Sequence, residues 1–125
     1  MFRLTAAQLR DATQTQVFEK LGEIDLPHLT PELSVPDWIV TSMDISPDGH
    51  RVVLLTYGAI YELAVDLAKG LPTGWTPGQT LQVVRFKPLP QQEAIAWLPD
   101  ASGLLIDTEA NNRPTAPLLR IPCAG

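Results

Sequence analysis

Residues 46–55 read SPDGHRVVLL, in which a tight turn is followed by an unbroken apolar run. Pro47 pre-sets φ for the first central position of a type I turn, Asp48 suits the next position, and Gly49 takes the left-handed conformation that follows. A three-residue turn of this kind joins two antiparallel strands. Because the run Val52–Leu55 is apolar at every position, we predict that other layers cover this strand on both faces. The stretch therefore predicts an all-β fold built from packed antiparallel sheets.

The turn recurs about fifty residues further along, at the spacing of a repeat protein. Residues 99–106 read PDASGLLI, again a Pro-Asp turn that leads into an apolar run. Ala101 and Ser102 stand before Gly103, so we expect a longer turn in this second copy. A repeat of this length that is built on hairpins is typical of β-repeat arrays.

A four-residue pattern widens the repeat. Segments 1–4, 60–63 and 118–121 each read apolar, bulky apolar, charged, aliphatic. In a strand, the second and fourth residues of such a segment share one face and the charged third residue lies on the other. Segments 16–27 and 82–90 are a second pair of similar segments, because both end on Leu-Pro. The segment 82–90 also alternates apolar and basic residues, as a half-exposed strand does. These echoes predict repeated units of nearly sixty residues.

Helix is the competing interpretation for two segments. Residues 5–20 have roughly helical spacing of apolar side chains, but Thr13 and Thr15 weaken it, so we expect at most a short helical turn there. Residues 59–67 contain Ile60 and Tyr61, which favour a strand. Segments 27–36 and 69–79 are rich in proline and glycine, and we expect long loops there.

Composition excludes two classes of partner. The net charge is −5 and the pI about 4.8, and no cluster of Lys or Arg forms a local basic patch. Nucleic acid and anionic membranes are therefore not expected as partners. We expect no membrane span, because no segment approaches the roughly eighteen apolar residues that cross a bilayer. The first residues lack the pattern of a signal peptide, and the compartment is otherwise not specified.

Residues 44–54, which read DISPDGHRVVL, resemble the Ser-Pro-Asp-Gly repeat of bacterial β-propellers of the TolB-like, WD-repeat-like kind. The resemblance covers about residues 40–122. It implies four-stranded antiparallel blades, and thus a partial β-propeller as a single β-repeat region. Residues 1–27 would be the tail of a preceding blade, 37–90 a complete blade and 91–125 an incomplete one. A small β-sandwich is the alternative fold.

Two blades are fewer than the about four to eight that close a propeller. Three interpretations remain open. The chain is a fragment of a longer propeller, it assembles with copies of itself or another chain, or it folds alone as a small twisted sheet or sandwich. Exposed strand edges would favour association with a protein partner or with itself.

Three carboxylates are candidate metal ligands. Glu93 stands just before a predicted strand, where propellers similar to the phytase-like, gluconolactonase-like and strictosidine-synthase-like groups place a channel-facing Glu, although Ala94 follows it here instead of glycine. Asp107 and Glu109 are two residues apart and would share one side of a strand, so they would bind a cation or share a proton. A solvated or hydrogen-bonding carboxylate is the more common role for each of the three.

Two residues are candidates for binding a ligand or partner. Asp44 precedes the first turn, where hydrogen bonding to the backbone is the competing role. Trp75 lies in the Gly/Pro loop and is the aromatic residue that we expect to be exposed, whereas Trp97, inside an apolar strand, is expected in the core.

These observations predict a β-propeller-type binding or scaffolding module that has no catalytic machinery and needs no cofactor. The alternative is a metal-dependent esterase-like or lactonase-like propeller hydrolase, in which Ca²⁺ or another cation would bind to channel carboxylates such as Glu93.

Overall fold

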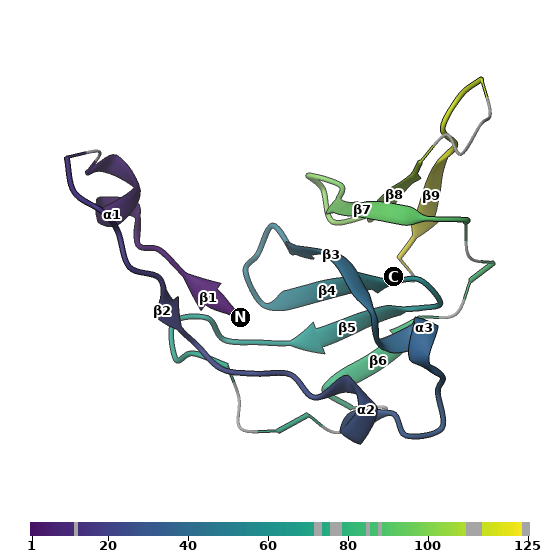
Figure 1. Ribbon diagram of the computed structural model, residues 1–125, viewed down its shortest axis with the longest axis horizontal. Helices are drawn as coiled ribbons and strands as arrows, with labels where there is room; N and C mark the ends of the chain where they lie inside the picture. Colours follow the sequence, from purple (N-terminus) through teal and green to yellow (C-terminus); the bar gives the residue numbers. More distant parts are fainter. Residues whose placement is uncertain are drawn as a thin grey trace.

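The computed structural model describes residues 1–125 except 12, 72–73, 76–78, 85, 88, 110–113 and 124–125. The described chain is all-β, with three antiparallel sheets and three short helices (Figure 1). The strands are β1 (Phe2–Arg3), β2 (Glu19–Lys20), β3 (Val40–Ile45), β4 (Arg51–Thr56), β5 (Ile60–Ala64), β6 (Leu81–Val84), β7 (Gln92–Trp97), β8 (Gly103–Thr108) and β9 (Leu118–Pro122). The sheets have the orders β1-β2, β3-β4-β5-β6 and β7-β8-β9. We call β3–β6 unit A, β7–β9 unit B, and residues 1–20 the N-terminal arm.

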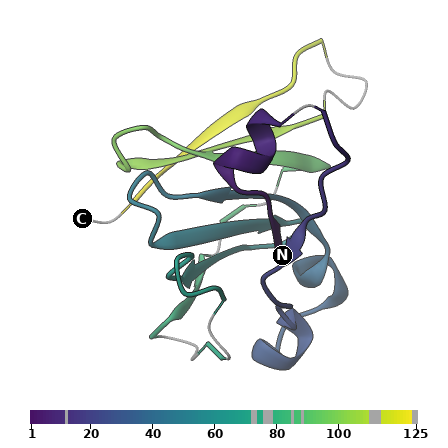
Figure 2. The same cartoon turned by 90° about the vertical axis from the view of Figure 1, so that its left-hand side faces the viewer.

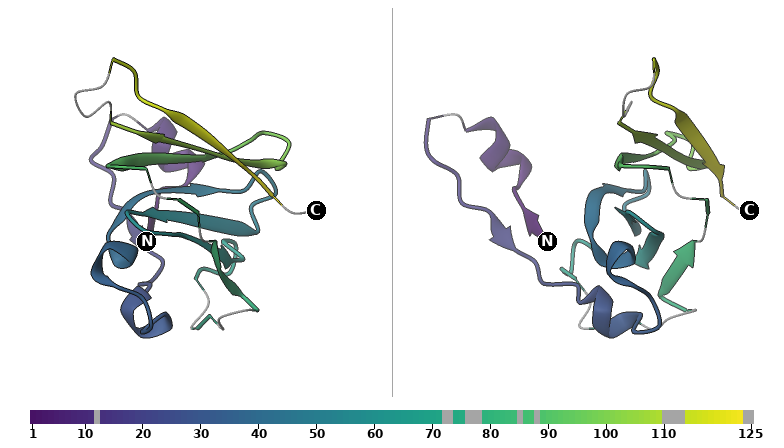
Figure 3. Two further views of the ribbon diagram at one scale, coloured as in Figure 1. Left: turned by 90° about the vertical axis from the view of Figure 1, so that its right-hand side faces the viewer. Right: turned by 45° about the vertical axis from the view of Figure 1, so that its right-hand side comes forward.

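Unit A lies between two apolar layers. Val52 and Leu54 of β4 pack into one core with Leu26, Trp75 and residues of β5 and β6, on the side of the N-terminal third of the chain. Val53 and Leu55 pack into the other core against β7 and β8. All four side chains are at most 5% exposed, which confirms the prediction that this strand is covered on both faces. Figures 2 and 3 show the sheet of unit B lying as a layer on the sheet of unit A.

The two units share one hairpin geometry. The pairs Val40↔Thr56, Met43↔Leu54 and Ile45↔Val52 of unit A recur in unit B as Gln92↔Thr108, Ile95↔Ile106 and Trp97↔Leu104. Every position is 52 residues further along, and the same bulge follows the first pair in both. The predicted recurrence of the turn about fifty residues further along is therefore present in the strand register.

The second turn is not longer than the first, contrary to the expectation from Ala101 and Ser102. Ser46 donates its N–H to Arg51 O at 2.9 Å, and Leu98 donates its N–H to Gly103 O at 2.8 Å, so both turns close over equal lengths. The left-handed position is held by Gly49 in the first turn, with φ 74°, and by Ala101 in the second, with φ 57°.

Gly103 has a different role from Gly49. It opens β8, and a Cβ built on it would lie 2.6 Å from the carbonyl oxygen of Ile121 in β9. Glycine is therefore required there because the third strand approaches closely, and not because the turn needs it.

The four-residue pattern falls on three strands, β1, β5 and β9. In β5 and β6 the pairs are Tyr61↔Val83 and Glu62↔Gln82, and in β1 and β2 they are Phe2↔Lys20 and Arg3↔Glu19. The arm is thus a partial copy of the outer strands of unit A. The Leu-Pro echo does not extend this likeness, because Leu26 and Pro27 belong to a helix and not to a strand.

Short helices lie in two of the segments: the one within residues 5–20 agrees with the expected helical turn, and those near residues 27–36 correct the expectation of a loop. Within residues 5–20, α1 (Ala6–Arg10) forms because Thr5 and Gln8 make a reciprocal capping box. The segment 27–36 is not simply a loop, since α2 (Leu26–Leu29) and α3 (Val35–Trp38) carry Pro27 and Pro36 in their first turns. Proline is suited to that position because its missing N–H has no helical partner there.

The strand expected in segment 82–90 is short. β6 ends at Val84, and Val84 and Phe86 pack partly buried against the core between the units. Arg85 and Pro88 lie outside the described residues.

Gly49 and Ala101 occupy equivalent left-handed turn positions, so exchanging glycine and alanine at them should change the free energy of unfolding in opposite directions. Ala101→Gly should stabilise the fold by roughly 0.5–1 kcal/mol. The left-handed conformation costs an alanine about 1–2 kcal/mol, and glycine removes this strain. Part of the gain is lost because glycine also raises the conformational entropy of the unfolded chain. Gly49→Ala should destabilise by about 1 kcal/mol through the backbone alone, since a Cβ there meets no atom within 4 Å. Urea unfolding of both variants measures the effects, and equal signs would contradict the assignment.

The turn aspartate predicts a pH dependence. The Ser46 hydroxyl and then the His50 N–H donate to Asp48, and these bonds lower the pKa of Asp48 below its ordinary value. A carboxyl with a lowered folded pKa contributes stability above its unfolded pKa, and this contribution is lost as the pH falls below about 4. Asp48→Asn should therefore lower the thermal midpoint at pH 7, and the difference from the wild type should close by about pH 2. A difference that is constant with pH would contradict this.

Candidate functional site

The first strands of the two units, β3 and β7, lie side by side in one direction, held by side chains of β3. Ser42 Oγ accepts the N–H of Ile95 at 3.2 Å, and Asp44 Oδ2 accepts the N–H of Trp97 at 2.7 Å. The other oxygen of Asp44 accepts the N–H of Ile45 at 2.8 Å. Both oxygens of this candidate binding residue are thus engaged with backbone, and Asp44 joins the two units.

Gln92 adds a second polar link between the units. Its side chain is fully buried, and Nε2 donates to the carbonyl oxygen of Thr56 at the end of β4. Its Oε1 accepts the N–H of Leu89 at 3.2 Å. Sequence reasoning missed this role, although one signal was present: an amide stands where unit A has the apolar Val40.

An aromatic contact completes the junction. The guanidinium of Arg51 lies 4.4 Å from the ring centre of Trp97 and also pairs with Glu62 at 3.4 Å. Trp97 is 7% exposed, which confirms the prediction that it belongs to the core. The junction therefore combines a cation–π contact, hydrogen bonds and an apolar core.

The three candidate metal ligands lie at one end of the β7–β8 hairpin. Glu93 is the extra residue of the bulge between Gln92 and Ala94, Asp107 pairs with Ala94, and Glu109 donates its N–H to Gln91 O at 3.1 Å. All three side chains are exposed. Among the described residues, no group of three or more His, Cys, Asp or Glu side chains is placed to hold a metal ion.

Trp75 is not exposed, contrary to the expectation from its Gly/Pro loop. It is 8% exposed and belongs to the core on the arm side of unit A. Its indole N–H donates to the carbonyl oxygen of Ala64 at 3.0 Å. Trp75 packs onto β5 because burial of a large ring next to a backbone acceptor satisfies both its apolar and its polar part.

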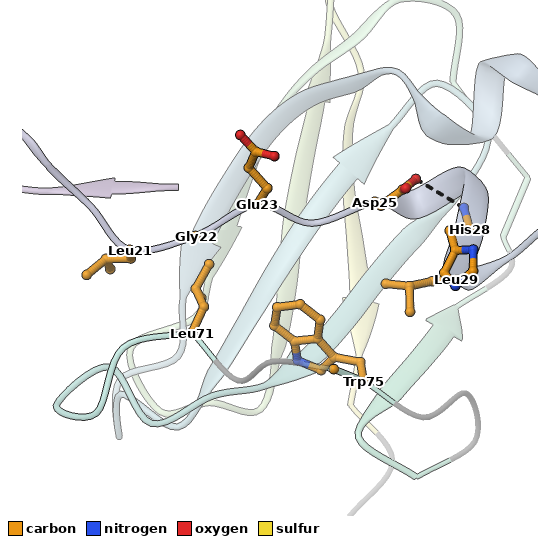
Figure 4. Close-up of a pocket in the computed structure, with 9 residues that line it drawn as sticks. Leu21, Gly22, Glu23, Asp25, His28, Leu29, Leu71 and Trp75 are labelled. Carbon is orange, nitrogen blue, oxygen red and sulfur yellow. Dashed lines mark hydrogen bonds between the residues drawn. The ribbon is translucent and has the colours of Figure 1, made fainter.

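Trp75 nevertheless lines a groove of about 490 Å³, which Leu71, Gly74 and Trp75 form with residues between Leu21 and Leu29. Its apolar lining comes from Leu21, Leu29, Leu71 and Trp75, and its polar lining includes Glu23, Asp25 and His28. In Figure 4 the Trp75 ring lies between Leu71 and Leu29, and the Glu23 carboxylate points away from the ring. The groove is thus apolar below and mainly acidic at its rim.

Local contacts hold the rim in place. Asp25 caps α2 by accepting the N–H of His28 at 3.2 Å. The Lys20 ammonium donates to Glu23, and this bond lowers the pKa of Glu23 below its ordinary value. Gly22 lies against Leu71, whose Cδ1 would be 3.3 Å from a Cβ built on the glycine. Glu23 therefore keeps its negative charge at the rim at neutral pH, beside the ammonium of Lys20.

Family models, curated protein sequences and solved structures show no match to this chain. No helix in the described ranges is long and apolar enough to cross a membrane.

We predict that the side-chain oxygen of Asp44, as a hydrogen-bond acceptor and not only as a negative charge, holds the two units together. Asp44→Ala should lower the free energy of unfolding by about 1.5–3 kcal/mol, because the N–H of Trp97 loses a charged acceptor. Asp44→Asn keeps an acceptor and should cost less. Urea unfolding combined with hydrogen exchange at Trp97 measures this, and equal losses in the two variants would contradict the role.

Proposed function

We propose that the chain is a non-catalytic binding or scaffolding module of the β-propeller type. Two units with one hairpin register, stacked face to face with their first strands parallel, support the propeller arrangement, in which blades follow one another around an axis. A β-sandwich is the architectural alternative, since two stacked antiparallel sheets also enclose one core. Under either architecture the unit–unit junction is structural and the binding surface lies elsewhere.

The groove at Trp75 is the observation that carries the binding role. Loops that a rigid sheet holds in place are where proteins most often bind partners. The floor at Trp75, Leu29 and Leu71 suits an apolar side chain, and the rim at Glu23 and Asp25 suits a cation. The groove therefore fits a segment of a protein partner that carries an apolar residue next to Lys or Arg. The net charge of −5 favours approach of the same basic segment.

Selection from a random peptide library on the purified chain tests this proposal. Enriched peptides should combine a basic residue with an apolar neighbour. Glu23→Lys should weaken their binding about threefold to tenfold, because it reverses a rim charge, and added salt should reduce the difference. Glu109→Lys is the matched control, since it makes the same charge change at an exposed site outside the groove lining, and it should leave binding unchanged.

The hydrolase alternative has its own readout. Thermal unfolding should show no shift with Ca²⁺, Mg²⁺ or Zn²⁺. A Ca²⁺-dependent rise that disappears in Glu93→Gln would favour the metal-dependent hydrolase and would count against a purely binding role. Equal effects of Glu23→Lys and Glu109→Lys on the selected peptides would remove the groove as the binding site.

A further inference from the structure

A second cavity, of about 310 Å³, lies between the N-terminal arm and unit A. Phe2 and Leu4 line it from the arm, and Met43 and Ile45 line it from β3. Phe2 is 62% exposed, Met43 42% and Ile45 39%. Large apolar side chains of the arm and of β3 therefore stay in contact with solvent although they line one cavity between the two elements. We call this place the arm cleft; the right-hand view of Figure 3 shows the arm standing beside the sheets.

The repeat shows how the same positions are covered elsewhere in the chain. Met43 and Ile45 correspond to Ile95 and Trp97 of unit B, which are 5% and 7% exposed. Ile95 and Trp97 are buried because β3 and β4 of unit A lie over them, with Val53 and Leu55 in the shared core. The strand β3 of unit A thus has the same apolar face as β7 of unit B. Since the hairpin β3–β4 covers that face of β7, the repeat indicates that a similar hairpin would cover the face of β3.

The arm supplies the other half of such a neighbour. β1 and β2 pair as β5 and β6 do, so the arm corresponds to the two outer strands of a unit. In unit A, β4 pairs with β5 along the edge opposite β6. Within the described residues, β1 pairs with β2 alone, so the edge that corresponds to β4 is free. A hairpin in the arm cleft would therefore add to the free edge of β1 and cover β3 at the same time.

The backbone N–H groups of the first strands indicate which side chains that hairpin would carry. The N–H groups of Ile95 and Trp97 point away from β8, toward Ser42 and Asp44. Because unit A has the same register, the N–H of Met43 points away from β4 and toward the cleft. An occupant would satisfy this donor with an acceptor side chain, as Ser42 does for Ile95.

A second copy of the chain does not offer this surface. Its Ser42 and Asp44 already hold its own unit B. The face of unit B that points away from unit A has Ala94 and Ala96 at the corresponding positions, and Asp107 where unit A has the buried Leu55. That face provides neither the acceptors nor the apolar match for β3.

We propose that the arm cleft binds a β-hairpin of a partner protein, whose edge strand carries a hydroxyl or carboxylate side chain opposite the N–H of Met43. The edge strand runs parallel to β3 and its neighbour pairs antiparallel with β1. This inference goes beyond the proposed groove, because it rests on the repeat geometry and uses a different face of the molecule.

Tandem fusions of the full chain test the proposal. The probe is a copy of residues 40–56, which carries Ser42, Asp44, Val53 and Leu55, joined to the N-terminus by a flexible Gly/Ser linker that makes the hairpin effectively millimolar. The control is a copy of residues 92–108, which has equal length but Ala94, Ala96 and Asp107 at the matching positions. Both fusions keep a backbone N–H at Met1 for its contact with Gly22 O.

The first fusion should unfold about 5 °C or more above the control fusion and should protect the amides of Phe2 and Met43 from hydrogen exchange. Met43→Asp in the body of the chain should abolish the shift, and Ser42→Ala in the fused copy should reduce it, because it removes the acceptor for the N–H of Met43. Equal midpoints for the two fusions would overturn the proposal.

A dimer of the unfused chain that Met43→Asp dissociates would assign the cleft to a second copy instead. Peptide binding at the groove, measured on the same proteins, separates failure of the cleft from failure of the proposed function.

Discussion

The burial of β4 on both faces is the constraint on which the rest of the structure depends. Its residues 52–56 are all buried, so apolar layers must lie on each side of the sheet that contains it. One layer comes from the N-terminal third and the Trp75 loop, and the other from unit B. Neither layer could be removed without exposing a complete strand face to water, which costs about 25 cal/mol for each Å² of apolar surface. The two-layer requirement therefore joins segments that are far apart in the chain.

Unit B follows the same design, with one difference on the face that points away from unit A. Its strand β8 buries Leu104 and Ile106 on the side of unit A, while Asp107 on the other side is exposed. The acceptors Ser42 and Asp44, which bind the backbone of β7, become Ala94 and Ala96 in unit B. The two faces of the repeat are thus not equivalent. One side of unit A retains the apolar residues that a further hairpin would cover, whereas the open side of unit B lacks the groups that would hold one.

Turn preferences and side-chain patterns predict much of the fold, but they predict less of the candidate site. The turn at Pro47–Gly49, the strand at Ile60, the core position of Trp97 and the covered strand β4 all follow from turn preferences and side-chain alternation. The short helices α2 and α3 do not follow from the sequence alone, because proline is common in loops and also suits a first helical turn. The burial of Trp75 and of Gln92 does not follow from local preference, because Trp75 packs in a core with Leu26 and Gln92 bonds to Thr56, both distant in the sequence.

The sequence by itself determined the all-β class, the positions of the two hairpin turns and the existence of a repeat, since these depend on neighbouring residues and on a period that can be counted. Only the tertiary structure decided that Ala101, and not Gly103, takes the place of Gly49, because the equivalence is defined by which strands the turn joins. It also decided that Asp44 holds the N–H of Trp97 and that the groove forms between Glu23 and Trp75. Those contacts join residues more than fifty positions apart, and no local preference specifies which of many distant groups will meet.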